Sequence, residues 1–155
     1  MFTIRAVTAE QTRPLRHKIL RPHLPFETTA YPNDCDNDTL HAGAFVEDDL
    51  VGVATVFRAP IPVEQDGILL NTSWQLRGMA VKEEMRGKGF GAALVQACIL
   101  HIAQNGGGVL WCNGRSSALK FYQSLNFQTI GEEFESNSGT GRHYVMWRHV
   151  NKETR

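Results

Sequence analysis

A glycine-rich run between a strand-like segment and a long apolar segment constrains the fold of this chain more than any other feature. The run reads Arg86-Gly87-Lys88-Gly89-Phe90-Gly91. Residues 73–81 before it have the pattern of a strand. Apolar residues in the range 92–104 after it recur at helical spacing and are numerous enough to indicate a largely buried helix. A strand that passes through glycines into a buried helix indicates an α/β domain.

Strand-like and helix-like segments alternate through most of the remaining chain. Residues 2–7 have the pattern of a half-buried strand. Thr8 and Gln11 form a capping box that opens a helix, in which Pro14 either lies in the first turns or causes a kink. Further strands are predicted at residues 41–47, 50–57, 109–112, 128–134 and 142–150, and a further helix at 116–125. The order β, α, loop, ββ, β, α, β, α, ββ contains no repeat and predicts a single domain over residues 1–155.

The segment from residue 21 to residue 39 breaks this alternation. It contains three prolines and an acidic run with Asp34, Asp36 and Asp38, so we expect mainly irregular structure with one short helix. Such an acidic run is typical of a solvated surface, and the alternative is a surface that attracts a polyamine or an aminoglycoside. Long loops of this kind often carry function.

Composition argues against several classes of protein. Of the 155 residues, 42% are hydrophobic and 21% are charged, which is typical of a globular domain, and the net charge of zero gives no sign of a nucleic-acid or membrane partner. No apolar run approaches the roughly 18 residues that span a bilayer, so a cytoplasmic location is predicted. The three cysteines and six histidines lack metal-binding spacing, so no metal is expected. Cys98 and Cys112 are predicted to be small core residues.

The glycine-rich run has the chemistry of an anion-binding turn. Backbone N–H groups in such a turn point at a phosphate, and the following helix adds the positive end of its dipole. Arg86 and Lys88 add positive charge, and Gly87, Gly89 and Gly91 allow unusual dihedral angles and close approach of a ligand. The alternative is a tight turn in which the glycines serve only close packing.

Two well-known phosphate-binding motifs do not fit this run. A Walker A loop requires Lys followed by Ser or Thr after its last glycine, whereas Ala92 and Ala93 follow Gly91. The dinucleotide-binding motif requires an acidic residue about 20 positions further along the chain. Residues 106–111 lie at that distance and contain no acidic residue.

Two segments resemble the GNAT family of N-acetyltransferases. The run from Gly78-Met79-Ala80-Val81 to Arg86-Gly87-Lys88-Gly89-Phe90-Gly91-Ala92 is similar to the acyl-CoA signature of the family, Gln/Arg-x-x-Gly-x-Gly/Ala. The run from Ala118 to Phe127, with Phe121-Tyr122 near its centre, resembles the later family segment Ala-x-x-Phe-Tyr-x-x-x-Gly-Phe. The resemblance covers the whole chain in the order of its elements, and individual residues from Leu76 onward.

The resemblance implies a fold and a cofactor site. The implied α/β fold has a mixed, mostly antiparallel sheet of about six to seven strands with helices on both faces, and two strands that splay apart at the cofactor cleft. Met79, Ala80 and Val81 are implied to contact the pantetheine arm of acetyl-CoA through their backbone, and the amides of residues 86–91 to contact its pyrophosphate. Tyr122 corresponds to the general acid that protonates the departing thiolate. The alternative is a core aromatic residue whose hydroxyl reaches the surface.

The chain departs from the family pattern at a few positions. Many members have Asn where this chain has Arg115, and Asn113 lies two residues earlier. Asn113 either bonds to the cofactor or closes the turn before the next helix. Asn126 replaces a family glycine, and Asn tolerates the left-handed conformation expected there. These departures resemble a less characterised GNAT subgroup, for which the sequence names no substrate.

The family transfers an acetyl group directly from the thioester to a primary amine in a ternary complex, and an amide of the fourth strand, here that of Met79, is implied to stabilise the oxyanion. No carboxylate lies on residues 73–81 to act as a base, so the base is left unassigned between His143 and deprotonation through water. The alternative for His143 is a structural or surface histidine on its predicted strand. Arg77 and Arg115 are candidates to bind a carboxylate of the acceptor, and the alternative partners are a CoA phosphate or a core carbonyl. The acceptor is a small-molecule amine or a protein amine.

Two other functions stay open. One is a catalytically silent sensor or structural subunit that binds acyl-CoA, although the retained Tyr122 argues against it. The other is the use of a different acyl donor or another nucleotide. Neither the acceptor nor the oligomeric state follows from the sequence, and a homodimer stays open.

Overall fold

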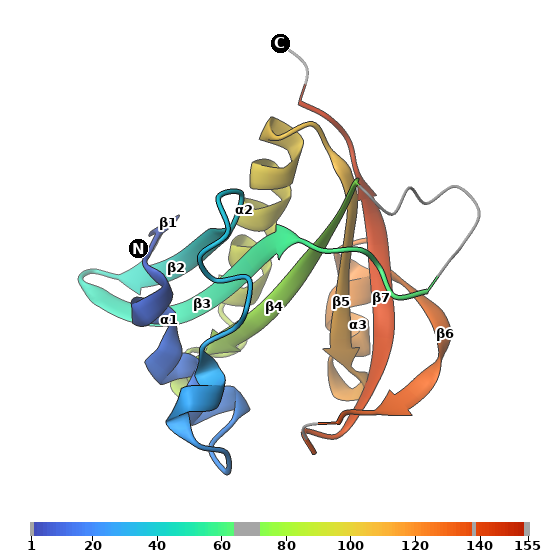
Figure 1. Ribbon diagram of the computed structural model, residues 1–155. Helices are drawn as coiled ribbons and strands as arrows, with labels where there is room; N and C mark the ends of the chain where they lie inside the picture. Colours follow the sequence, from blue (N-terminus) through green and yellow to red (C-terminus); the bar gives the residue numbers. More distant parts are fainter. Residues whose placement is uncertain (1, 64–71, 138, 154–155) are drawn as a thin grey trace. The chain divides into compact units, whose positions relative to one another are not determined.

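The computed structural model describes residues 2–63, 72–137 and 139–153, and its strands form a seven-stranded sheet (Figure 1). The strands are β1 (Phe2–Ala6), β2 (Leu40–Val46), β3 (Asp49–Arg58), β4 (Ser73–Val81), β5 (Gly108–Arg115), β6 (Gln128–Glu135) and β7 (Arg142–Val150). The α-helices of the described residues are α1 (Ala9–Leu15), α2 (Phe90–Gln104) and α3 (Leu119–Ser124). Shorter turns are the π-helical η1 (Arg16–Leu20) and the 3-10 helices η2 (Phe26–Thr29), η4 (Glu83–Met85) and η5 (Ser116–Ala118).

The strands follow the order β1-β2-β3-β4-β5-β7-β6. Four of the pairings are antiparallel: β1 with β2, β2 with β3, β5 with β7 and β6 with β7. β4 pairs with β5 in parallel through three residue pairs, from Ser73↔Val109 to Gln75↔Trp111. The sheet is therefore mixed and mostly antiparallel, and the predicted α/β fold with six to seven strands is confirmed.

The chain divides into two compact units. The first contains Met1–Phe57 and Leu76–His101, and the second contains Arg58–Gln75 and Ile102–Arg155. β4 and α2 each contribute residues to both units. The single domain expected over residues 1–155 stays a prediction.

In the first unit, helices cover both faces of β3. Neighbouring residues of a strand point to opposite faces. Val53 packs in an apolar cluster with Leu15 of α1, whereas a Cβ at Gly52 would lie 3.1 Å from Leu94 of α2. α1 and α2 therefore lie on opposite faces of β3, as the family resemblance implied (Figure 1).

The start of α1 follows its sequence closely. The Thr8 side chain accepts a hydrogen bond from the Gln11 N–H at 3.1 Å, and the Gln11 side chain accepts one from the Thr8 N–H at 2.8 Å, so the predicted capping box is confirmed. Pro14 lies inside the helix and has no N–H to donate, and the chain continues into the π-helical turn that begins at Arg16. Arg16 itself is fully buried.

In the second unit, α3 and an apolar cluster lie on opposite faces of β5 and β7. A Cβ at Gly114 of β5 would lie 2.9 Å from Met146 of β7 and 3.2 Å from Tyr122 of α3. The apolar cluster contains residues from β5, β6, β7 and the segment after β3, namely Ile61, Val109, Trp111, Ile130, Val145 and Trp147. Side chains at odd and even positions of a strand point to opposite faces, so residues 109 and 111 point away from the face of residue 114. The apolar cluster and α3 therefore lie on different faces.

Most predicted boundaries are confirmed to within one or two residues, and β5 differs most. It was predicted at residues 109–112 but extends to Arg115, because it pairs with β7 over eight positions that end at Arg115↔His143. The helix predicted at 116–125 is divided into η5 and α3. Asn126 has a φ of 70°, which confirms the expected left-handed conformation, and η2 is the short helix expected in the segment 21–39.

Candidate functional site

The turn between η4 and α2 exposes the backbone at the start of a 15-residue helix. Arg86, Gly87, Lys88 and Gly89 are exposed, whereas Phe90 is buried, with its ring centroid 4.7 Å from that of Phe2. Phe90 therefore anchors the first turn of α2 while the four residues before it face solvent.

Two glycines of this turn adopt backbone conformations that favour glycine. Gly87 and Gly89 have φ values of 76° and 90°, and a Cβ at either would have no described heavy atom within 4 Å. The predicted unusual dihedral angles are thus confirmed at these two positions. They are wrong for Gly91, which lies in the first turn of α2. The open space also argues against the alternative that these glycines serve close packing.

The first turn of α2 presents backbone donors that no described side chain caps. The N–H of Ala93 donates to the carbonyl of Gly89 at 3.1 Å, so the N–H groups of Phe90, Gly91 and Ala92 precede the helical hydrogen-bond pattern. Glycine at the capping position offers no side-chain acceptor, and the first turn contains no acidic residue. The positive end of the helix dipole is therefore available to an anion.

Arg77, Met79 and Val81 are half-buried residues of β4 that alternate with more deeply buried neighbours, including Ala80. The parallel ladder of β4 with β5 ends at Gln75, so these candidates lie outside it. The contact of residues 79–81 with pantetheine, and the cleft expected at splayed strands, stay predictions.

Gly78 of β4 lets an aromatic ring and a guanidinium approach the strand. Its φ is 68°, and a Cβ there would lie 3.0 Å from Arg16 Nε and 3.0 Å from Tyr31 Cε2. The guanidinium carbon of Arg77 lies 3.8 Å from the centroid of the same Tyr31 ring. The predicted acceptor residue Arg77 is thus brought against Tyr31, a residue that the sequence did not single out.

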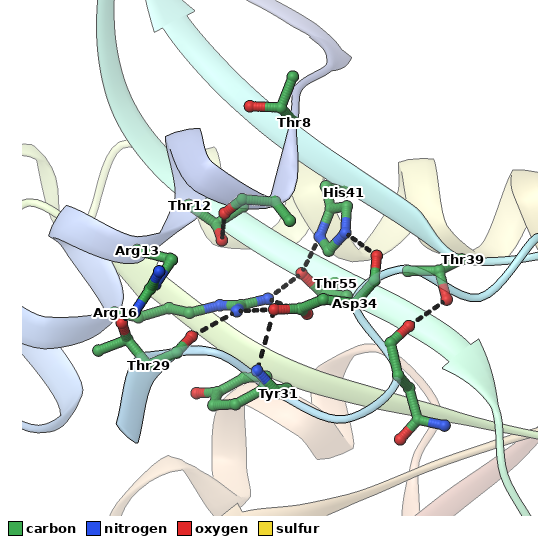
Figure 2. A network of polar contacts seen from close by, with 12 residues as sticks. Thr8, Thr12, Arg13, Arg16, Thr29, Tyr31, Asp34, Thr39, His41 and Thr55 are labelled. Carbon is green, nitrogen blue, oxygen red and sulfur yellow. Dashed lines mark hydrogen bonds and ion pairs between the residues drawn. The ribbon is translucent and has the colours of Figure 1, made fainter. Parts of the chain in front are cut away.

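Figure 2 shows Arg16 at the centre of a buried polar network that the sequence did not predict. Its guanidinium donates two hydrogen bonds to the Asp34 carboxylate, at 2.8 and 3.0 Å. It also donates to the Thr29 carbonyl and to the Thr55 hydroxyl, each at 2.8 Å. His41 extends the network, with Nδ1 at 2.8 Å from Thr55 Oγ1 and with Nε2 donating to the Asp34 carbonyl at 2.9 Å. The network joins η1, β2, β3 and the segment 29–34.

The network corrects the interpretation of the acidic run as solvated surface. The Asp34 side chain is 7% exposed, whereas Asp36 and Asp38 are exposed. Burial raises the pKa of Asp34, but hydrogen bonds from Arg16 and the Tyr31 N–H, with the charge of Arg16, outweigh it and hold the pKa below its ordinary value. No local pattern indicated this pairing, because the partners are 18 residues apart and one lies in an irregular segment.

In the second unit, Tyr122 is buried in α3, with its ring centroid 5.3 Å from that of Phe127. Its hydroxyl is hydrogen-bonded to the Cys112 side chain. Burial raises the pKa of the Cys112 thiol to about 12 against the opposing effect of this hydrogen bond, so the thiol is neutral at pH 7. Cys98 and Cys112 are both buried, as predicted.

The other candidates of the second unit lie on β5 and β7. Asn113 is exposed within β5 and not in the turn before the next helix, which removes the turn-closing alternative. Arg115 is half-buried and lies opposite His143 in the ladder. His143 Nδ1 donates to the Gly141 carbonyl at 2.8 Å, and its ring stacks on Phe134 with centroids 5.9 Å apart. Nε2 of the neutral ring therefore carries the lone pair.

Two kinds of feature are absent from the residues that the structure describes. No three His, Cys, Asp or Glu side chains come together to hold a metal ion in residues 2–63, 72–137 and 139–153. No helix in these ranges is long and apolar enough to cross a membrane.

Known proteins match nearly the whole chain. Residues 6–146 match the acetyltransferase (GNAT) domain. The chain is 30% identical over 148 residues to YitI of Bacillus subtilis (strain 168), an uncharacterised N-acetyltransferase, and the match covers 96% of each protein.

Solved structures share the fold. The ribosomal-protein-S18-alanine N-acetyltransferase from Escherichia coli has a TM-score of 0.72 at 18% identity, over 100% of this chain and 97% of that one. An aminoglycoside 6'-N-acetyltransferase complexed with coenzyme A has a TM-score of 0.67 at 16% identity, over 99% of each chain. At these identities the likeness shows the fold alone. With the domain match and the Bacillus relative, it establishes that the chain belongs to the GNAT family and is an N-acetyltransferase, an enzyme of the acyltransferase class.

Proposed function

We propose that this protein transfers the acetyl group of acetyl-CoA to a primary amine by direct attack within a ternary complex. The family uses acetyl-CoA and acts on amine acceptors. The observation that carries the proposal is the exposed turn at residues 86–89. It leads into a helix whose first N–H groups are capped by none of the described side chains, and its two glycines have positive φ and open space beside them. These features fit the pyrophosphate of acetyl-CoA.

The cofactor contacts in this proposal come from backbone more than from side chains. The amides of residues 86–91 bind the pyrophosphate, and Arg86 and Lys88 add positive charge. Backbone groups of residues 79–81 bind the pantetheine arm, which is consistent with a β4–β5 ladder that ends at Gln75. Asn113, which is exposed on β5, is a further contact to the cofactor.

Tyr122 is the proposed general acid. During transfer a C–N bond forms to the amine and the C–S bond of the thioester breaks, so the departing thiolate requires a proton. The Tyr122 hydroxyl is hydrogen-bonded to the Cys112 thiol, whose pKa is raised to about 12. Because this thiol is neutral at pH 7, Cys112 supplies no thiolate that would compete for the proton of Tyr122. The amide of Met79 is the proposed donor to the thioester oxygen.

His143 is the proposed base that accepts the proton lost by the amine. Only a neutral amine attacks, and an amine with a pKa near 10 is mostly protonated at pH 7. The hydrogen bond from Nδ1 to the Gly141 carbonyl leaves Nε2 to accept a proton directly or through water. Arg115, its neighbour across the ladder, is a proposed acceptor contact, as is Arg77 in the first unit.

An amine panel with acetyl-CoA tests the proposal, with release of the free CoA thiol as the readout. We expect turnover with at least one class of primary amine. Tyr122→Phe should keep its affinity for acetyl-CoA in calorimetry and lose roughly 10²- to 10⁴-fold in turnover, the usual contribution of a general acid. Tyr144→Phe, which removes a hydroxyl from β7, is the matched control and should change turnover little.

The outcomes separate the competing functions. Binding of acetyl-CoA without release of CoA for any amine would indicate a sensor or structural subunit. Absence of binding would contradict the assignment of the glycine turn. Unaltered turnover in Tyr122→Phe would make Tyr122 a packing residue.

A further inference from the structure

The ring of Tyr31 in the first unit attracts two guanidinium groups. The guanidinium carbons of Arg16 and Arg77 lie 3.9 and 3.8 Å from its centroid, well within the range in which a cation is attracted to an aromatic face. Tyr31 itself is buried. The arrangement therefore concentrates positive charge at a site that is largely removed from water.

Only one of these two arginines has a carboxylate partner. Both hydrogen bonds that Asp34 accepts from a guanidinium group come from Arg16. Its Oδ2 also accepts one from the Tyr31 N–H at 3.0 Å. Its two oxygens are thus occupied by groups of the same network. Asp34 neutralises Arg16 and leaves no equivalent interaction for Arg77.

Arg77 is a half-buried cation that has no directly paired carboxylate among the described residues. The described parts of the chain give its guanidinium the stacking contact with Tyr31 and no hydrogen bond or ion pair. Burial is the main cause that lowers the pKa of Arg77, and the positive charges of Arg21 and Arg16 lower it further, against opposing effects of Tyr31 and of the Asp34 charge. Removing a charge from water without a partner is costly, so this position favours the binding of an anion.

The hydroxyl of Tyr31 adds a neutral donor beside this cation. Within the described residues it makes no hydrogen bond, whereas the ring below it is held by Arg16 and by the close approach to Gly78. A guanidinium and a hydroxyl both donate hydrogen bonds that a carboxylate accepts well. Arg21, which donates to Thr28 Oγ1 at 3.2 Å, adds long-range positive charge.

We propose that the amine acceptor also carries a carboxylate, and that Arg77 binds this carboxylate together with the hydroxyl of Tyr31. This inference rests on the proposed acetyl transfer and names its substrate class. Arg77 precedes Met79, the proposed thioester contact, by two residues on β4, so their backbones are at most about 7 Å apart. That spacing matches an acceptor of amino-acid size.

Pairs of amines that differ only in the anionic group test the inference. Each of several amino acids is compared with its carboxamide, for example alanine with alaninamide, and O-phosphoethanolamine represents phosphorylated amines. The wild-type enzyme should prefer the carboxylate by at least about tenfold in kcat/KM, because a hydrogen-bonded charge pair is lost in the amide. The amino group of the amide is less basic and thus more often neutral, so this preference cannot come from amine basicity.

Variants of the two donors should change this preference selectively. Arg77→Gln should raise KM for the carboxylates by about tenfold or more and leave the carboxamides and the acetyl-CoA affinity unchanged. Tyr31→Phe keeps the ring that stacks on both arginines and removes only the hydroxyl. It should therefore reduce the preference for carboxylates over carboxamides by less than Arg77→Gln does. Arg5→Gln is the matched control, because Arg5 stacks on the Phe45 ring at 3.9 Å in the same unit.

A binding measurement separates this inference from the proposed function. With CoA present, calorimetry should show that N-acetylalanine binds more tightly than N-acetylalaninamide, and that Arg77→Gln abolishes the difference. Equal acetylation of acids and amides by the wild-type enzyme would overturn the inference and leave the proposed transferase function standing. A preference for O-phosphoethanolamine over every carboxylate would also overturn it. If Arg77→Gln does not fold, two other results decide. The inference is overturned if Tyr31→Phe keeps the full carboxylate preference and the wild-type protein binds N-acetylalanine and N-acetylalaninamide equally.

Discussion

Arg16 donates hydrogen bonds to two separate parts of the first unit: to Thr29 and Asp34 in the segment 29–34, and to Thr55 in β3. Its Nε has no hydrogen-bond partner among the described residues and faces Gly78. A buried ion pair of this kind adds little net stability, because desolvation offsets much of the Coulomb attraction between its charges. Loss of one partner is a different matter, since the remaining charge stays buried and unpaired.

Asp34→Asn should therefore destabilise the protein by roughly 3–5 kcal/mol at pH 7. Because the folded-state pKa of Asp34 is lowered, its contribution to stability is present above the ordinary pKa of 3.8 and is lost as the pH falls through the folded value. The difference in unfolding free energy between wild type and variant should shrink as the pH falls below about 4. Urea unfolding at several pH values measures this. Asp36→Asn, at an exposed position, is the control and should cost less than about 0.5 kcal/mol.

Gly114 is a second residue at which a small change in the side chain should affect stability. A Cβ there would lie 2.9 Å from Met146 and 3.2 Å from Tyr122, so Gly114→Ala should destabilise the protein by about 1–3 kcal/mol. If Tyr122 is the general acid, turnover should fall as well, because the ring must shift. The double variant with Met146→Leu shortens the neighbouring side chain and should recover part of the stability. Full stability in Gly114→Ala would show that this packing is looser than described.

At the scale of elements, the turn before α2 can be tested with a matched pair of glycines. Gly89 and Gly106 have φ values of 90° and 101°, and a Cβ at either would have no described atom within 4 Å. Alanine at either position should therefore lower the free energy of unfolding by a similar amount, about 1–2 kcal/mol, through backbone strain. Only Gly89→Ala should weaken acetyl-CoA binding, by about tenfold if one charged hydrogen bond to the pyrophosphate is lost.

Calorimetric titration of both variants with acetyl-CoA gives the result directly. Equal affinities would remove the glycine turn from the site. A loss of affinity in both variants would show that strain and not phosphate contact is the cause.

Regular elements were predictable from sequence because their signals are local. The limits of β4 and β7 match the prediction residue for residue, and the capping box at Thr8 marked the start of α1. β5 was predicted too short because Asn113, Gly114 and Arg115 have no strand preference of their own, and pairing with β7 holds them extended. The π-helical turn after Pro14 has no sequence signal comparable to a cap.

At the scale of the whole molecule, ligand linkage offers a test that needs no acceptor. If acetyl-CoA binds the folded protein alone, a concentration of 100 Kd should add about 2.7 kcal/mol to the free energy of unfolding. For a chain of this size that corresponds to a rise in Tm of roughly 5–10 °C. ATP at the same concentration is the control and should give a much smaller rise. Equal shifts with both ligands would indicate a general nucleotide site.

The candidate site was predictable only where chemistry follows a sequence motif. The glycine turn and Tyr122 were identified through such motifs, and anion binding by the turn stays a prediction that its open backbone fits. The role of Tyr31 and the buried pairing of Asp34 were missed because both depend on contacts with Arg16 or Arg77, which are distant in sequence. Long-range polar contacts of this kind leave no periodic signal.

The attachment of residues 29–34 to Arg16 has a practical consequence for redesign of the enzyme. Pro32 and Cys35 are exposed, whereas Thr29, Tyr31 and Asp34 are fixed by buried contacts. A combinatorial library that varies only the two exposed positions would sample new chemistry beside a rigid support. Randomising the whole segment would instead select mostly for variants that recover the fold.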